Sequence, residues 1–213
     1  MNSFKTVKQA ASDEYIISKS RFIGHAAPAE TEEAALAFLQ HVRLTHRDAS
    51  HNCFAYVIGQ NAGIMRFSDD GEPGGTAGMP MMEVIRARGV TNVCVVVTRY
   101  FGGILLGAGG LVRAYSHACS LAMNAAQVAV MEKSQRWWVE IAYPQWDKAL
   151  HHLKSQPANL EKTEFAATVT ATLLMREKDA PAVLSLLDTL TDGQAEKLMT
   201  DELFYLWPEE KQP

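Results

Sequence analysis

Residues 95–115 read VVVTRYFGGILLGAGGLVRAY, an apolar strand that runs through a glycine-rich loop into a helix. A second stretch, residues 66–80, reads RFSDDGEPGGTAGMP and holds three acidic residues in another glycine-rich loop. Together the two stretches contain nine glycines, and glycine is favoured where a backbone turns sharply or is closely approached. Both loops therefore predict tight turns into helices, and they mark the candidate site of this chain.

The residues around the two loops predict a mixed α/β first domain over residues 1–134. Thr31 is typical of a helix N-cap, because Glu32 and Glu33 follow it as an acidic first turn. The unbroken apolar run of residues 93–97 is typical of a strand buried on both faces. Strands are expected at residues 15–25, 51–58, 63–67 and 93–97, and helices at residues 32–43, 78–88 and 111–127.

Residues 135–213 predict a second domain, which makes the chain a two-domain α+β protein. Apolar residues alternate from Trp137 to Tyr143, which indicates a strand with one buried face. Asp179 is expected to cap a helix that has Pro181 in its first turn. Strands are expected at residues 137–143, 160–166, 169–175 and 198–207, and helices at residues 146–153 and 180–192. The order β-α-β-β-α-β is that of the ferredoxin-like split βαβ arrangement.

Composition limits the class of protein. The 213 residues are 47% hydrophobic and 21% charged, which is typical of a soluble globular protein. No apolar run approaches the ~18 residues of a membrane span, and residues 1–11 lack the apolar core of a secretory signal. We therefore expect a cytoplasmic protein with no membrane partner.

The charge is unevenly distributed. Residues 1–134 hold 12 basic against 11 acidic residues, and residues 135–213 hold 8 against 13. This balance excludes a bulk polyanion binder, and no DNA partner is expected. Contact with RNA would need a local cluster of arginines in the first domain. The candidates are Arg21, Arg43, Arg47, Arg66, Arg86, Arg88, Arg99 and Arg113.

Cysteine and histidine patterns point to no metal or redox chemistry. Cys53, Cys94 and Cys119 are odd in number and widely spaced, which argues against a disulfide framework. His51-Asn52-Cys53 has no second ligand pair in zinc spacing. His51 and His117 are expected to be partly buried and hydrogen-bonded. Since no nucleophile motif occurs either, we assign no metal, no cofactor and no catalytic residue.

The second glycine loop leaves two interpretations open. It fits neither the P-loop nor the dinucleotide fingerprint. It does follow a strand and open a helix, where backbone N–H groups can bind an anion. Alternatively, its glycines let the helix from residue 111 pack closely against the preceding strand. The glycines concerned are Gly102, Gly103, Gly107, Gly109 and Gly110.

Asp69, Asp70 and Glu72 of the first loop also have two interpretations. They could ligate a hard cation or divide acid and base roles. Alternatively, the two aspartates accept hydrogen bonds from the turn and from the helix entering at Gly78. Arg99 needs a carboxylate, a phosphate or an aromatic face as its partner, so it pairs with one of these acids or binds a ligand.

We expect the two loops to lie side by side and to form one concave surface. That surface would hold the acidic loop, Arg99 and the glycines, with Arg21 and Arg113 adding positive charge. An anion would bind there against the N–H groups at the start of the helix at Leu111.

Motifs within and upstream of the two stretches carry a resemblance to a known family. They are Lys19-Ser20-Arg21-Phe22-Ile23, His51-Asn52-Cys53, Asp69-Asp70-Gly71-Glu72-Pro73, Gly75-Thr76-Ala77-Gly78, Pro80, Arg99-Tyr100-Phe101-Gly102-Gly103, Leu106-Gly107, Gly109-Gly110-Leu111 and Ala114-Tyr115. With these motifs the sequence resembles the IMPACT family, in particular its bacterial YigZ-like branch. The resemblance covers most of residues 15–127 and implies no enzymatic reaction. Its first domain would have the fold of ribosomal protein S5 domain 2, which also occurs in domain IV of the translocation factor EF-G. Its second would be a ferredoxin-like module similar to domain V of that factor.

Three hypotheses of function follow. The preferred one is a cytoplasmic, non-enzymatic protein that binds RNA or the ribosome and takes part in the regulation of translation. The second is a small-molecule enzyme that uses the acidic loop and Arg99 over an anion at the glycine loop. The third is a protein-interaction module in which the same loops dock a partner protein.

Overall fold

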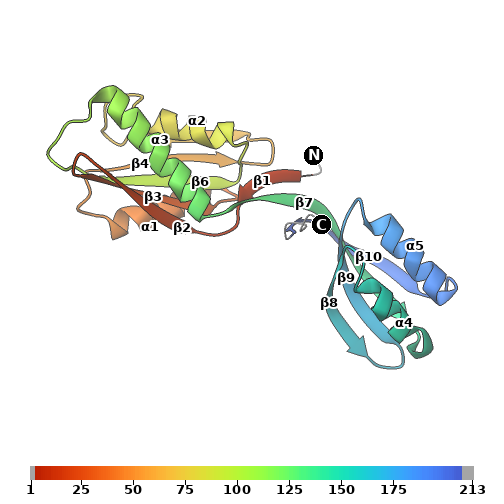
Figure 1. Ribbon diagram of the computed structural model, residues 1–213. Coiled ribbons are helices and arrows are strands. Elements are labelled where there is room, and N and C mark those ends of the chain that lie inside the picture. The colour runs from red at the N-terminus through yellow and green to blue at the C-terminus, as the bar shows by residue number, and fades with distance from the viewer. Residues whose placement is uncertain (1–2, 208–213) are drawn as a thin grey trace. The chain divides into compact units, whose positions relative to one another are not determined.

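The computed structural model describes residues 3–207, and Figure 1 shows their arrangement. Contacts divide the chain into two compact units, residues 3–130 and the residues from Met131 on. The described residues form five helices and two sheets, so the chain is a mixed α/β protein.

The first unit is built on an antiparallel sheet in the order β2-β3-β6-β4-β5. In β6, Val95 and Val97 pack toward α2 and α3, whereas Val96 packs toward α1. Figure 1 shows α1 on the opposite face of the sheet from α2 and α3. Helices therefore cover both faces of β6, which explains why residues 93–97 are all apolar. The elements are β1 (Ser3–Val7), β2 (Ala11–Ile17), β3 (Ser20–Pro28), α1 (Glu32–Thr45), β4 (His51–Ile58), β5 (Ile64–Ser68), α2 (Gly78–Ala87), β6 (Val93–Tyr100) and α3 (Gly107–Ala125).

Local signals in this unit match the structure closely. Thr31 caps α1, since its hydroxyl oxygen accepts a hydrogen bond from the backbone N–H of Ala34 at 3.2 Å. The three cysteines are free, as expected from their spacing, and all three are buried. By contrast, His117 is exposed rather than partly buried, and its ring meets the edge of Tyr15.

The single strand expected at residues 15–25 is wrong. The chain forms a hairpin there, in which Ile17 pairs with Ser20 across a two-residue turn. Ser18 and Lys19 make that turn with φ values of 48° and 63°. Such turns are usually marked by Asn or Gly, so the sequence carried no signal for this one.

The second unit has the element order β-α-β-β-α-β that the sequence predicts. Its strands pair antiparallel in the order β10-β7-β9-β8. Val139 and Leu173 of the sheet share a core with Trp146 of α4 and Leu187 of α5. The elements are β7 (Val128–Ile141), α4 (Tyr143–Leu153), β8 (Ala158–Phe165), β9 (Val169–Arg176), α5 (Ala180–Thr191) and β10 (Glu196–Leu206).

Two details of the second unit differ from the prediction. β7 begins at Val128, well before the expected Trp137, and runs without interruption past residue 134. Asp179 occupies the N-cap position of α5 but makes no capping hydrogen bond, since its carboxylate lies 3.6 Å from Arg176.

No helix in the described range, residues 3–207, is long and apolar enough to cross a membrane.

Candidate functional site

The acidic loop is held together by its own aspartates. Asp69 Oδ1 accepts hydrogen bonds from the backbone N–H groups of Ala77 (3.0 Å) and Gly78 (2.8 Å). Asp69 Oδ2 accepts a third from Gly75 at 2.8 Å. Burial opposes ionisation of this carboxyl, but the three backbone donors outweigh it and lower the pKa of Asp69 below its ordinary value. Asp69 thus fixes the turn and the first turn of α2.

Asp70 ties the same loop to β4 and α1. One carboxylate oxygen accepts the backbone N–H of Asn52 at 2.6 Å, and the other accepts Arg43 at 2.9 Å. Its backbone adopts a φ of 44°, a conformation that aspartate tolerates better than most residues. Both aspartates therefore make the hydrogen bonds expected of turn-stabilising residues.

Glu72 points the other way, into the first unit. Its Oε1 lies 2.6 Å from Arg99 Nη1 and accepts a hydrogen bond from the Tyr115 hydroxyl at 2.7 Å. All three residues are buried. Burial, together with the neighbouring Cys53 and Glu72, raises the pKa of Tyr115 well above its ordinary value. Tyr115 is therefore a neutral donor, and the Glu72 charge is balanced by Arg99.

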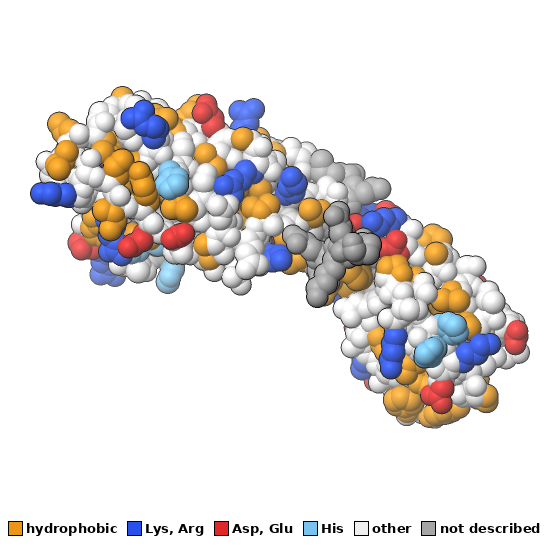
Figure 2. Space-filling view, viewed as in Figure 1, with side chains coloured by type: hydrophobic (Ala, Val, Ile, Leu, Met, Phe, Trp, Pro, Cys, Tyr) orange, Lys and Arg blue, Asp and Glu red, His pale blue; other side chains and the backbone are white. Residues whose placement is uncertain are grey.

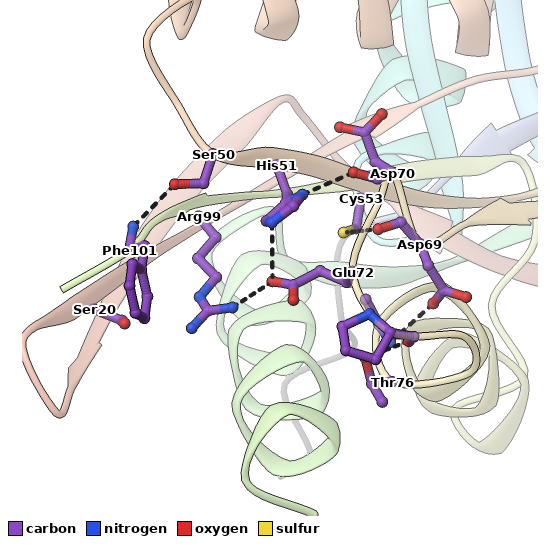
Figure 3. Close-up of polar contacts among 12 residues, drawn as sticks. Ser20, Ser50, His51, Cys53, Asp69, Asp70, Glu72, Thr76, Arg99 and Phe101 are labelled. Carbon is purple, nitrogen blue, oxygen red and sulfur yellow. Dashed lines mark hydrogen bonds and ion pairs between the residues drawn. The ribbon is translucent and has the colours of Figure 1, made fainter. Parts of the chain in front are cut away.

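Arg99 lies within β6 rather than after its end, and one of its nitrogens is a buried donor without an acceptor in the described residues. Its guanidinium carbon lies 5.3 Å from the ring centres of both Phe22 and Phe101. Such contacts favour a cation. Nη1 donates to Glu72, whereas Nε is buried and has no hydrogen-bond partner among residues 3–207. Figure 3 shows Arg99 beside Phe101, with Glu72 and His51 on its other side.

His51 completes this cluster. Its Nδ1 lies 2.8 Å from the carbonyl oxygen of Asp70, and a carbonyl only accepts, so Nδ1 carries the proton. The other ring nitrogen, Nε2, lies 3.9 Å from Glu72 Oε1. Nε2 of the neutral ring is therefore an acceptor, and it becomes a donor when the ring is protonated.

These side chains meet at a cavity of about 450 Å³ at the start of α3, here called the α3 pocket. Its deep wall includes Arg99 and Glu72, and its rim includes the exposed side chains of Phe101 and Leu105. His51 and Gly107 also line it. No group of three or more side chains placed to hold a metal ion is found in residues 3–207.

α3 begins one turn earlier than predicted, at Gly107 instead of Leu111. Its N-cap residue, Leu106, makes no side-chain capping bond. Gly107 has a φ of 70°, which only glycine adopts readily. The first N–H groups of α3 are consequently uncapped by side chains, and those of Gly107 and Ala108 belong to residues that line the pocket.

The other glycines of this segment have different surroundings. A Cβ on Gly102 would lie 2.0 Å from the carbonyl carbon of Lys19, and one on Gly110 would lie 2.9 Å from the Cβ of Leu106. These two glycines serve close packing. Gly103, with a φ of 81°, and Gly109 are exposed, and neither lines the pocket.

The expected concave surface is therefore present only in part. The pocket brings together Glu72, Arg99 and Gly107, while Asp69 and Asp70 support the loop from outside it. Arg21 is exposed and pairs with Glu14 at 2.8 Å, and Arg113 is exposed on α3. Neither of these arginines lines the pocket.

His51 is partly buried and hydrogen-bonded, as expected, but sequence reasoning missed its place beside Arg99 and the roles of Phe101 and Tyr115. His51 faces Arg99 because the two residues are register partners in β4 and β6. No local sequence pattern predicts this strand register. The burial of Tyr115 could have been predicted, since it follows Leu111 at helical spacing on the buried face of α3.

Comparison with known proteins identifies the family. Residues 18–123 match the Impact N-terminal domain, and residues 139–194 match the Domain of unknown function DUF1949. The IMPACT family member YvyE of Bacillus subtilis is 39% identical over 206 residues, which cover 97% of this chain and 94% of YvyE. The chain belongs to the IMPACT family.

Other comparisons agree with the YigZ-like resemblance read from the motifs. The IMPACT family member YigZ of Escherichia coli is 50% identical over 110 residues, covering 51% of this chain and 54% of YigZ. A Haemophilus influenzae IMPACT family member is 33% identical over 196 residues, covering 91% and 95% of the two chains. A crystal structure of a hypothetical protein superposes with a TM-score of 0.59 at 31% identity, covering 94% of this chain and 98% of that one. The α3 pocket lies within the part that matches the Impact N-terminal domain.

Proposed function

We propose that this IMPACT family member is a non-enzymatic, cytoplasmic RNA-binding protein that acts in the regulation of translation, with the RNA of the ribosome among its targets. The α3 pocket carries the proposal. Proteins that bind single-stranded RNA combine donors for the phosphates with aromatic or apolar faces for the bases. The pocket offers both, since the uncapped start of α3 and Arg99 lie beside Phe101 and Leu105.

The fold supports the proposal by analogy. Counted in chain order, the strands of the second unit read 4-1-3-2 across an antiparallel sheet. We propose that this unit is ferredoxin-like and that the first is similar to ribosomal protein S5 domain 2, the folds that the family resemblance implies. Both folds occur in a translation factor, although a fold alone does not establish a function.

The charges of the first unit limit how RNA would bind. Arg21, Arg43, Arg66 and Arg99 each have a carboxylate within 4 Å. On the face shown in Figure 2, the basic side chains of this unit are scattered singly. Few phosphates would therefore be neutralised. If about three are, the logarithm of affinity should fall with the logarithm of salt with a slope of about −2.

Fluorescence anisotropy of a labelled single-stranded RNA, titrated at several salt concentrations, tests the proposal. Binding with a slope of this size is expected. Leu105→Ala should weaken binding about tenfold or more, because burying an apolar side chain against a base contributes roughly 0.8 kcal/mol for each methylene group that the substitution removes. Ile104→Ala is the matched control, since Ile104 is a neighbouring exposed apolar residue that does not line the pocket. Absence of binding at low salt would contradict the proposed function.

A further inference from the structure

The deep wall of the α3 pocket contains a donor without an acceptor. The side chain of Arg99 is 6% exposed, and its Nε is buried without a hydrogen-bond partner in the described residues. A guanidinium does not lose its protons in proteins, so this N–H stays a donor at every accessible pH. A ligand that supplies an acceptor at this point would satisfy it.

The start of α3 adds a second set of donors at the same cavity. α3 has 19 residues, and its N-cap Leu106 offers no side-chain acceptor. Gly107 and Ala108 line the pocket and have no side chains that could occupy those N–H groups. A helix start of this kind favours an anion through its backbone donors and its dipole.

The charge balance of the cluster allows an anion to enter. Glu72 is the carboxylate that lines the pocket, and Arg99 and Tyr115 already bond its Oε1. His51 Nδ1 donates to the Asp70 carbonyl, and His51 Nε2 lies 3.9 Å from Glu72 Oε1. The Glu72 carboxylate is therefore compensated by Arg99 inside the cluster, and an anion at the α3 start meets no unbalanced negative charge in the lining.

Most of the remaining lining is apolar and matches a flat organic group. Phe101 is 48% exposed and Leu105 is 87% exposed, so both side chains keep solvent-accessible surface at the rim. Leu106 and Leu111 continue the apolar wall inward. A cavity of about 450 Å³ falls within the range of small-molecule sites.

We propose that the α3 pocket binds a single nucleoside monophosphate unit. Its phosphate lies at the N–H groups of Gly107 and Ala108 and at Arg99 Nε, and its base packs against Phe101 and Leu105. The unit comes either from an RNA strand or from a free nucleotide, which share this chemistry. Only the RNA source rests on the proposed function.

Calorimetric titration of the full chain with AMP, adenosine and inorganic phosphate tests the assignment. AMP should bind at least tenfold more tightly than either of its halves, because both parts of the pocket are then occupied. Equal affinity for AMP and phosphate would leave only an anion site, and no binding of AMP would remove the site; either result overturns the proposal.

Ala108→Asp tests most directly whether the phosphate binds at the start of α3. Ala108 is exposed, and a carboxylate in the first turn of a helix stabilises the helix while repelling an anion there. AMP affinity should fall at least tenfold with no loss of melting temperature. Ala108→Asn, a neutral variant of the same shape, is the control and should retain most of the affinity. Equal AMP affinity of the two variants would place the phosphate elsewhere.

A competition experiment separates the two sources of the nucleotide. If AMP displaces single-stranded RNA and Ala108→Asp weakens RNA binding, the unit belongs to an RNA strand. If AMP binds and RNA does not, the pocket takes a free nucleotide; the proposed function then fails while the site stands. If RNA binds, and Ala108→Asp and Leu105→Ala leave the affinities for both RNA and AMP unchanged, the nucleotide site is wrong and RNA binding survives elsewhere.

Discussion

Glu72 and Arg99 lie 27 residues apart in the sequence and form a buried ion pair, with Glu72 Oε1 2.6 Å from Arg99 Nη1. The pair joins the acidic loop to β6 and forms part of the deep wall of the α3 pocket. Its partners are all internal, so its first role is to hold the two glycine-rich segments in one place.

Glu72→Gln should destabilise the protein by about 3–5 kcal/mol, because it leaves Arg99 buried without a counter-charge. Tyr115→Phe removes only one hydrogen bond to Glu72 and should cost about 1 kcal/mol. Urea unfolding followed by circular dichroism measures both. Equal stability of the Gln variant and the parent protein would show that the pair is not structural.

Asp69→Asn should lower the free energy of unfolding by roughly 1–3 kcal/mol. The amide would turn an N–H₂ group toward one of the three backbone donors that the carboxylate accepts. Asp147→Asn is a suitable control, since Asp147 is exposed on α4. If the two variants have the same free energy of unfolding, Asp69 does not stabilise the loop as its geometry indicates.

Gly102→Ala should destabilise the first unit by about 1–3 kcal/mol or more, because the added Cβ would lie 2.0 Å from the backbone of Lys19. Gly74→Ala is the matched control, as no atom lies within 4 Å of its added Cβ. Denaturant midpoints of the two variants provide the comparison. A Gly102 variant as stable as the Gly74 variant would mean that the backbone at Lys19 shifts away from the added methyl group at little energetic cost.

Stability should also depend on pH through His25. Burial, and then the charges of His46 and His41, lower the pKa of His25 from 6.5 to about 4. A lowered pKa in the folded state means that the unfolded state binds the proton first as pH falls. The free energy of unfolding should therefore fall by up to about 3 kcal/mol as the pH is lowered from 6.5 to 4.

Unfolding free energies at pH 7.5, 5.5 and 4.5 measure this loss. His25→Asn keeps a polar atom near the Ser12 hydroxyl, which the histidine contacts at 2.7 Å, but does not titrate. The variant should show a flatter pH profile than the parent chain. Identical profiles would assign the loss to other groups.

The second unit should be more stable alone when the fragment includes the first half of β7. Residues Met131–Arg136 pair with β10, and the predicted start at residue 137 would remove that pairing. A fragment of residues 128–207 is expected to unfold cooperatively in circular dichroism, and a fragment of residues 137–207 to be less stable. Equal stability of the two would support the sequence-based boundary, and disorder of both would mean that the unit depends on the first.

Local sequence signals determined most of the secondary structure and the family. The Thr31 cap, the apolar run of residues 93–97 and the alternation after Trp137 act over a few neighbours, so they can be read along the chain. The turn at Ser18 and Lys19 escaped because neither residue is typical of a left-handed conformation. The start of α3 escaped because glycines carry little helix signal.

Only the tertiary structure decided what the candidate site contains. The strand register places His51 beside Arg99, and the path of the acidic loop turns Glu72 inward while Asp69 and Asp70 bond backbone and Arg43. The sequence named Glu72, Arg99 and Gly107 as candidates but could not separate them from Arg21 or Gly102. Composition and spacing determine which elements form, whereas the pairing of strands distant in sequence determines which side chains share a cavity, because that pairing depends on the packing of the whole unit.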